Sequence, residues 1–81
     1  MPDIRDKPLR YRELLSILQK FGVQEKVKKG SRRMLFHPNI DDKPAFMPIH
    51  PHNKNHEFSR NVIRAVRERF GITIEDFYSK L

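Results

Sequence analysis

The pattern that most restricts the fold is a helical stripe of apolar residues between positions 9 and 21, followed directly by a glycine. Steps of three and four residues separate the members of this stripe, which are Tyr11, Leu14, Leu15, Leu18 and Phe21. Such spacing places side chains on one face of a helix. Gly22 is typical of the residue that ends a helix, so the sequence predicts one amphipathic helix that must bury a single face.

Three short segments after this glycine alternate between apolar and polar residues, which favours β-strands. The expected strands are residues 23–29, 32–37 and 45–50. Gly30 and Ser31 form the predicted turn between the first two strands, and residues 38–43 form the next turn. Pro48 cannot donate a hydrogen bond to a ladder, so the third strand is expected to lie at an edge of the sheet or to end early.

A second helix and a final helical turn close the chain. Ser59 is expected to cap the second helix and Gly71 to end it, while Thr73 caps a short turn over residues 74–78. Helices on both sides of a three-stranded meander are expected to cover the same face of its sheet. The sequence therefore predicts an α+β, two-layer domain.

The length of 81 residues predicts one domain, over residues 9–81, preceded by a loose polar arm of residues 1–8. The chain has no cysteine, which excludes a disulfide framework and thiolate metal sites. No apolar run approaches the roughly 20 residues of a membrane span. The arm also lacks the apolar core of a signal peptide, so no membrane association and a cytoplasmic location are expected.

The positive charge of the chain is concentrated in one stretch. The net charge is +7, and residues 23–38 hold five cations and only one anion. The five cations are Lys26, Lys28, Lys29, Arg32 and Arg33. A local basic block on a small domain favours a polyanion such as RNA as the partner. A solvated basic face without a ligand, and a face that meets an acidic protein, remain the alternatives.

Five motifs follow one another along the chain in a recognisable order. They are residues 12–22, Lys29-Gly30-Ser31, His37-Pro38, Met47-Pro48-Ile49-His50, and residues 63–77. This ordered set, over about residues 8–81, resembles the HicA toxin family, whose members are small RNA-cleaving partners of HicB antitoxins. The resemblance implies the α-β-β-β-α order of a double-stranded-RNA-binding domain, with RNA (messenger RNA in particular) and a HicB-like antitoxin as partners and no cofactor.

The sequence departs from the family where catalysis is expected. In the family a histidine follows Gly-Ser at the first or second position and acts in catalysis, whereas this chain has Arg32 and Arg33 there. The loop after His50 is also about three residues longer than in the family. Arginine stays protonated and cannot act as a base, although it can hold a phosphate. We therefore predict that the chain binds RNA and that its nuclease activity is weak or lost. The predicted RNA-binding residues are Lys26, Lys28, Lys29, Gly30, Ser31, Arg32 and Arg33.

The histidines leave a second interpretation open. His37 and His50 end neighbouring predicted strands and could approach each other across the sheet, where they would supply a base and an acid for metal-free RNA cleavage. The simpler interpretation is that both are structural or exposed.

Two other uses of the side chains are less favoured. His50, His52 and His56 have a permissive spacing for a metal, but without cysteine or an evident supporting shell a solvated loop is the better interpretation. The phenylalanines Phe36, Phe46, Phe58, Phe70 and Phe77 are expected in the core rather than as platforms for RNA bases.

Overall fold

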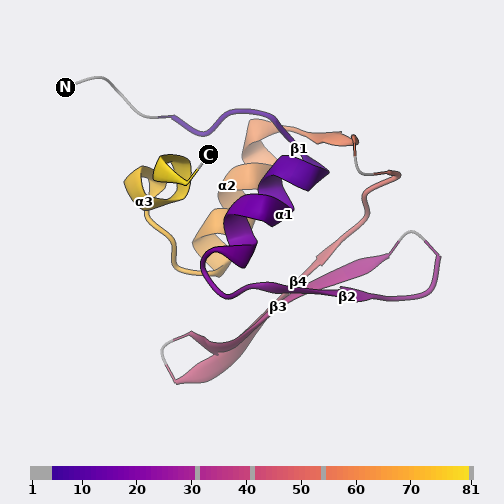
Figure 1. The fold of residues 1–81 in the computed structure, drawn as a ribbon, viewed down its shortest axis with the longest axis horizontal. Coiled ribbons are helices and arrows are strands. Elements are labelled where there is room, and N and C mark those ends of the chain that lie inside the picture. The colour runs from indigo at the N-terminus through magenta and orange to yellow at the C-terminus, as the bar shows by residue number, and fades with distance from the viewer. Residues whose placement is uncertain (1–4, 31, 41, 54, 81) are drawn as a thin grey trace.

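The computed structural model describes residues 5–30, 32–40, 42–53 and 55–80, which form a layer of helices over a three-stranded sheet (Figure 1). In chain order the elements are β1 (Leu9–Arg10), α1 (Tyr11–Gln19), β2 (Gln24–Val27), β3 (Arg33–Ile40), β4 (Lys43–Ile49), β5 (Glu57–Phe58), α2 (Arg60–Arg69) and α3 (Ile74–Ser79). The predicted α+β class and the α-β-β-β-α order are confirmed, with two short strands added. None of the described helices has the length and apolar character that crossing a membrane requires.

The main sheet is antiparallel, and β3 is its central strand between β2 and β4. Leu35 of β3 lies opposite Met47 of β4, and Phe36 lies opposite Phe46. Because β4 is an edge strand, Pro48 costs the ladder little, and the predicted edge position of this strand is confirmed.

The turn predicted over residues 38–43 is wrong for most of its length, because β3 continues to Ile40 and β4 already begins at Lys43. The register shifts between His37 and Ile40. This irregularity accommodates Pro38, which has no backbone N–H for the ladder. Ile40 of β3 pairs with Lys43 of β4, and Asp42 before Lys43 takes a positive φ of 66°.

A second, two-stranded ladder joins the start of the domain to the segment before α2. β1 pairs with β5, so that Leu9 lies opposite Phe58 and both side chains are buried. The first helix consequently begins at Tyr11 rather than at Leu9. Arg10 is its extended N-cap residue, and the Glu13 side chain accepts a hydrogen bond from the Arg10 N–H at 3.1 Å. Strands of two residues are too short to show alternation in the sequence.

The core lies between the helices and the inner face of the sheet. Its fully buried side chains are Leu14, Ile17, Leu18, Val23, Leu35, Ile63, Val66 and Phe77. The buried face of α1 thus includes Ile17, while Leu15 and Phe21 of the predicted stripe are only half-buried. Ser59 and Thr73 cap α2 and α3 as predicted, accepting hydrogen bonds from the backbone of Val62 and Asp76.

Phe58, Phe70 and Phe77 are in the core as predicted, but the prediction is wrong for Phe36 and Phe46. Even-numbered residues of β4, and those of β3 before its irregularity, face away from the helices, because side chains alternate along a strand. Phe36 and Phe46 therefore lie on the outer face of the sheet, where Phe46 is 42% exposed.

The part of the predicted loose arm that the structure describes is packed against the domain. The Asp6 carboxylate accepts hydrogen bonds from Arg67 Nε and Nη2 at 3.1 and 2.9 Å, and the Tyr78 hydroxyl donates to it at 3.1 Å. The Lys7 N–H donates to the same hydroxyl at 3.0 Å. This cluster joins the arm to α2 and α3, whereas residues 1–4 lie outside the described residues.

Candidate nucleic-acid interface

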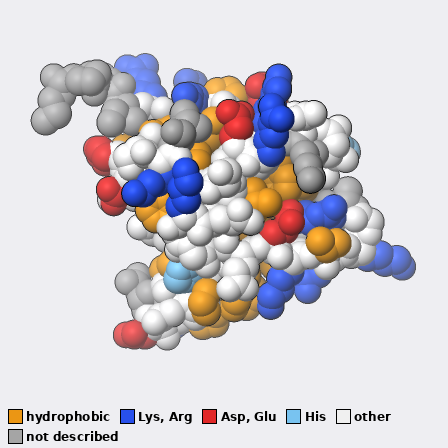
Figure 2. Space-filling model, viewed as in Figure 1, with side chains coloured by type: hydrophobic (Ala, Val, Ile, Leu, Met, Phe, Trp, Pro, Cys, Tyr) orange, Lys and Arg blue, Asp and Glu red, His pale blue; other side chains and the backbone are white. Residues whose placement is uncertain are grey.

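Cations gather at the end of the β2–β3 hairpin, which lies at the right of Figure 1 and where Figure 2 shows blue Lys and Arg side chains. Lys28, Lys29 and Arg32 are all exposed there. The Lys28 N–H donates to the Arg32 carbonyl at 3.0 Å and closes the bend. Gly30 takes a φ of +68° within it, a left-handed conformation that other residues adopt only with strain. Ser31, which also belongs to the predicted RNA-binding set, lies outside the described residues.

Arg33 is not part of this exposed group, because its side chain turns under the hairpin toward α1. Its Nε lies 3.7 Å from Glu25 Oε2, and the Arg33 side chain is 26% exposed. Its Nη1 donates to the carbonyls of Gly30 at 3.1 Å and Arg32 at 2.9 Å. Arg33 therefore stabilises the backbone of the bend, and the Glu25 carboxylate offsets much of the positive charge of Arg33.

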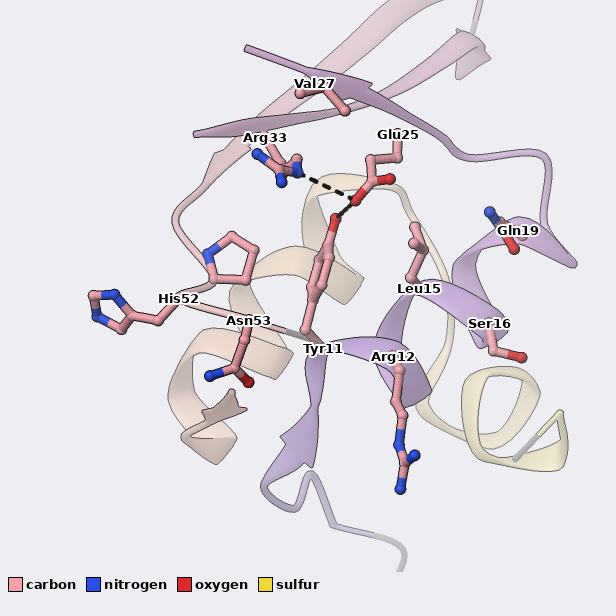
Figure 3. Close-up of a pocket in the computed structure, with 11 residues that line it drawn as sticks. Tyr11, Arg12, Leu15, Ser16, Gln19, Glu25, Val27, Arg33, His52 and Asn53 are labelled. Atoms are coloured by element: carbon pink, nitrogen blue, oxygen red, sulfur yellow. Dashed lines mark hydrogen bonds and ion pairs between the residues drawn. The ribbon is translucent and has the colours of Figure 1, made fainter. Parts of the chain in front are cut away.

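Tyr11 of α1 completes this polar cluster. Its hydroxyl donates a hydrogen bond to Glu25 Oε2, so Glu25 is held from both sides (Figure 3). Burial, and then the bond to Glu25, raise the pKa of Tyr11 far above its ordinary value of about 10. Tyr11 is thus a hydrogen-bond donor at neutral pH and cannot act as a base.

The cluster forms one wall of a cleft of about 540 Å³ between α1, the hairpin and the loop after β4. Leu15 and Val27 supply apolar lining, and Val27 is 68% exposed. His52 is also at the rim, but its ring points away from Glu25 and Arg33 (Figure 3). The remaining lining residues are Arg12, Ser16, Gln19, Pro51 and Asn53.

Lys26 lies on the opposite face of the hairpin from Arg33. Its Nζ is 4.4 Å from the centroid of the Phe36 ring, a cation–π contact on the outer face of the sheet. The predicted RNA-binding set is therefore divided into three places: Lys28, Lys29 and Arg32 at the bend, Arg33 in the cleft, and Lys26 on the outer face.

His37 and His50 do not approach each other across the sheet, although the sequence left this possibility open. His37 lies opposite Ala45, whereas His50 follows Ile49, which lies opposite Arg33. The two histidines therefore end up toward opposite ends of the β3–β4 ladder. His37 is four positions beyond Arg33 on β3, which corresponds to roughly 14 Å at about 3.4 Å of rise per residue. His50 lies at the Arg33 end of the ladder, so this separation is too large for both histidines to contact one phosphodiester.

The ring of His37 is used in the local structure. Its Nδ1 accepts a hydrogen bond from the Asn39 N–H at 3.0 Å, so Nε2 is the donor to the Phe21 carbonyl, 3.1 Å away. The ring thus links the β3 irregularity to the turn after α1. His50, by contrast, is exposed and directly follows Ile49, the residue paired with Arg33.

His52 and His56 lie close together after β4. Their ring centroids are 4.9 Å apart, and His56 packs on Phe58 at 4.6 Å. Within the described part of the chain, no three side chains of the metal-binding types gather as ligands. His56 thus contacts the buried Phe58 beside the β1–β5 ladder.

Sequence reasoning missed the roles of Glu25 and Tyr11. Glu25 is the sole acid among residues 23–38, and it shares the inner face of the hairpin with Arg33. A single carboxylate inside a basic block was the signal that could have revealed the pair. Nothing in the sequence indicated Tyr11, because its contact depends on how α1 crosses the sheet.

Comparison with protein families gives one match. The sequence model for the HicA toxin of bacterial toxin-antitoxin systems matches residues 11–72, from the start of α1 to just beyond α2. No curated protein matches the chain.

Proposed function

The chain belongs to the HicA toxin family of bacterial toxin–antitoxin systems, and on this premise we propose that its hairpin binds RNA while its nuclease activity is weak or lost. One observation carries the proposal: arginines occupy both positions where the resemblance leads to a catalytic histidine. Arg32 is exposed at the bend and Arg33 is held by Glu25. Neither can take a proton from a 2′-hydroxyl group, because a guanidinium stays protonated.

The exposed cations at the bend are suited to a phosphodiester backbone. Lys28, Lys29 and Arg32 carry charge on long side chains that reach beyond the hairpin. Contacts of this kind hold a nucleic acid without reading its bases. The proposed ligand is therefore RNA, with messenger RNA in the cytoplasm as the class that the family resemblance implies.

A second candidate function is metal-free cleavage of messenger RNA. The position of His50 favours it, since His50 is exposed and follows the residue paired with Arg33. An imidazole there could exchange protons while an arginine stabilises the charge of the transition state. In this candidate mechanism His50 exchanges the protons and His37 takes no part.

A third candidate is a protein-interaction module that meets a HicB-like antitoxin. Val27 favours it, because this apolar side chain is 68% exposed between the cations of the hairpin. An acidic partner with an apolar contact residue would match both features. Binding to such a partner is compatible with RNA binding. The two proposals differ for the isolated protein, because only the RNA-binding proposal predicts that the protein retains RNA without its partner.

The test is to incubate the purified protein with messenger RNA, with and without a chelator, and to follow both binding and chain length. We expect retained, intact RNA. The variants His50→Ala and His37→Ala are the matched pair, because His50 is exposed and follows the residue paired with Arg33, whereas the His37 ring is hydrogen-bonded within the fold. Rapid cleavage that survives the chelator and disappears in His50→Ala alone would establish the second candidate instead. Absence of RNA binding at low salt would exclude the first two candidates and favour the protein-interaction module.

A further inference from the structure

The outer face of the three-stranded sheet carries a pair of aromatic rings that the core does not use. Phe36 of β3 and Phe46 of β4 are directly opposite each other in the ladder. Their ring centroids are 5.0 Å apart and their planes meet at 38°. All three helices lie over the other face (Figure 1), and Phe46 is 42% exposed. The pair thus presents aromatic surface to solvent, and Phe46 is the more exposed of the two residues.

Two cations lie beside this pair, one from β2 and one from α2. On the β2 side, Lys26 Nζ lies 4.4 Å from the Phe36 ring centroid. On the β4 side, Arg69 of α2 donates from Nε to the Phe46 carbonyl at 2.8 Å, which fixes its guanidinium at the sheet edge. One cation thus lies over the Phe36 ring, and the other lies at the β4 edge beside the backbone of Phe46.

The described strand positions next to the pair on this face add no negative charge, and the exposed Asp42 lies beyond them, between β3 and β4. The other described outward-facing residues of the three strands between Gln24 and Pro48 include Gln24, Met34, Pro44 and Pro48, which are neutral. In Figure 2, hydrophobic side chains reach the surface along the lower, sheet side of the molecule, next to Lys and Arg side chains. An anionic partner with a flat apolar part matches this face by charge and by shape.

A nucleotide has both of these parts, namely a base with an exposed π-face and a phosphate. Stacking of bases on aromatic side chains is a general way of holding single strands, and it tolerates any base. A duplex keeps its bases within its own stack, so only an unpaired base can lie flat on Phe46. Lys26 covers the Phe36 ring, which leaves Phe46 as the ring that is open to a base.

Resting on the proposed function, we propose that the outer face is a second RNA contact that takes single-stranded RNA. An unpaired base stacks on Phe46, Phe36 supports that ring from the neighbouring strand, and Lys26 and Arg69 hold phosphates on either side. The hairpin end and this face share β2 and β3, so one strand of RNA can follow the hairpin from one contact to the other.

The test compares two fluorescent probes of equal length and charge, a ten-nucleotide oligouridylate and an abasic ribose-phosphate oligomer. Phe46→Leu removes the ring but keeps an apolar side chain, and Met34→Leu on the same face is the matched control. We expect Phe46→Leu to weaken oligouridylate binding by about five- to tenfold, in line with stacking energies, and to leave the abasic oligomer unchanged. Met34→Leu should change neither.

Circular dichroism would show that Phe46→Leu is folded, as its exposure predicts. As a second variant, Lys26→Gln should lower the salt dependence of oligouridylate binding by about one phosphate contact. The inference is overturned if Phe46→Leu leaves oligouridylate binding unchanged, or weakens both probes equally. It is also overturned if this variant instead abolishes self-association or the binding of a partner protein.

These results separate the two proposals. If both probes bind in a salt-sensitive way and Arg32→Ala weakens them while Phe46→Leu does not, the hairpin proposal stands and the stacking inference fails. If neither probe binds at low salt, the proposed function fails, and the stacking inference fails with it.

Discussion

Glu25 determines what Arg33 can do at the hairpin. The Glu25 carboxylate lies 3.7 Å from Arg33 Nε and accepts a hydrogen bond from the Tyr11 hydroxyl. An arginine already held in this way offers less positive potential to a phosphate than the exposed Arg32. At the scale of single residues, the two arginines that replace the expected histidine are therefore not equivalent.

Replacing Glu25 by Gln tests this division. The variant keeps the shape of the side chain but removes the charge that offsets Arg33. We expect RNA affinity to rise by about three- to tenfold, which corresponds to roughly 0.7 to 1.4 kcal/mol. Fluorescence anisotropy with a labelled RNA measures it. Glu75→Gln, on α3, is the control for the same change in net charge, and an equal rise in both variants would contradict the specific role of Glu25.

Asp6 gives a prediction on stability and pH. Hydrogen bonds from Arg67 lower the pKa of Asp6 below its ordinary value of 3.8, and Tyr78 adds to this effect. A lowered folded-state pKa means that the ionised form stabilises the fold above the unfolded-state pKa, and that this contribution is lost as the pH falls through the folded-state value. The arm contact should therefore be fully present at neutral pH.

We expect Asp6→Asn to lower the free energy of unfolding at pH 7 by about 1 to 3 kcal/mol, because the half-buried guanidinium of Arg67 loses its charged acceptor. The difference from the unmodified protein should shrink as the pH drops below about 4. Urea denaturation at several pH values measures both effects. A difference that is constant down to pH 3 would show that the contact does not depend on ionised Asp6; Glu57→Gln is the exposed control.

At the scale of elements, His37 joins the turn after α1 to the irregular part of β3. The same ring approaches Gly22, which has a φ of +87°, and a Cβ built on Gly22 would lie 3.0 Å from His37 Nε2. Gly30 in the hairpin also has a positive φ, of +68°, but a Cβ there would meet nothing within 4 Å. The two glycines share the backbone requirement and differ in the space around them.

The comparison of Gly22→Ala with Gly30→Ala follows from this difference. Both variants should lose about 1 to 2 kcal/mol of unfolding free energy from the left-handed backbone conformation. Gly22→Ala should lose more, because the new methyl group also displaces the ring of His37 and weakens its hydrogen bond to Phe21. Thermal or urea denaturation gives the two values. Equal losses would mean that the ring moves aside without cost.

The elements that were predictable from the sequence are those with a long repeat. The helical stripe of α1 and the alternation in β3 carry a signal over several residues, while Ser59 and Thr73 are recognisable as caps by residue type. The β1–β5 ladder and the extension of β3 past Pro38 could not be predicted, because they depend on contacts between distant segments and on a bulge that relieves the proline. The outward position of Phe36 and Phe46 follows from alternation only once the covered face of the sheet is known.

The site shows the same limit. The concentration of cations at the hairpin was visible in the sequence, but their division among the bend, the cleft and the outer face depends on strand register. The register also separates His37 from His50, which sequence spacing alone had allowed to meet. A shift of one residue in the pairing of β2 with β3 would move Lys26 to the opposite face of the sheet.

At the scale of the whole molecule, the hairpin concentrates charge at one end of a small domain with a net charge of +7. A backbone contact by the three exposed cations Lys28, Lys29 and Arg32 has a characteristic dependence on salt. The logarithm of the affinity should fall with the logarithm of the salt concentration by roughly 0.7 to 0.9 for each phosphate contacted. Three contacts at the bend thus predict a slope of about −2 to −3.

The most direct test of the proposed RNA contact is the salt dependence of RNA affinity for the unmodified protein and for Arg32→Ala, measured by anisotropy. Arg60→Ala, which removes an exposed charge on α2, is the matched control. We predict that Arg32→Ala weakens binding alike across RNA sequences and reduces the slope by about 1, while Arg60→Ala leaves the slope unchanged. A salt-independent affinity, or the same slope for the unmodified protein and both variants, would contradict RNA binding by the hairpin.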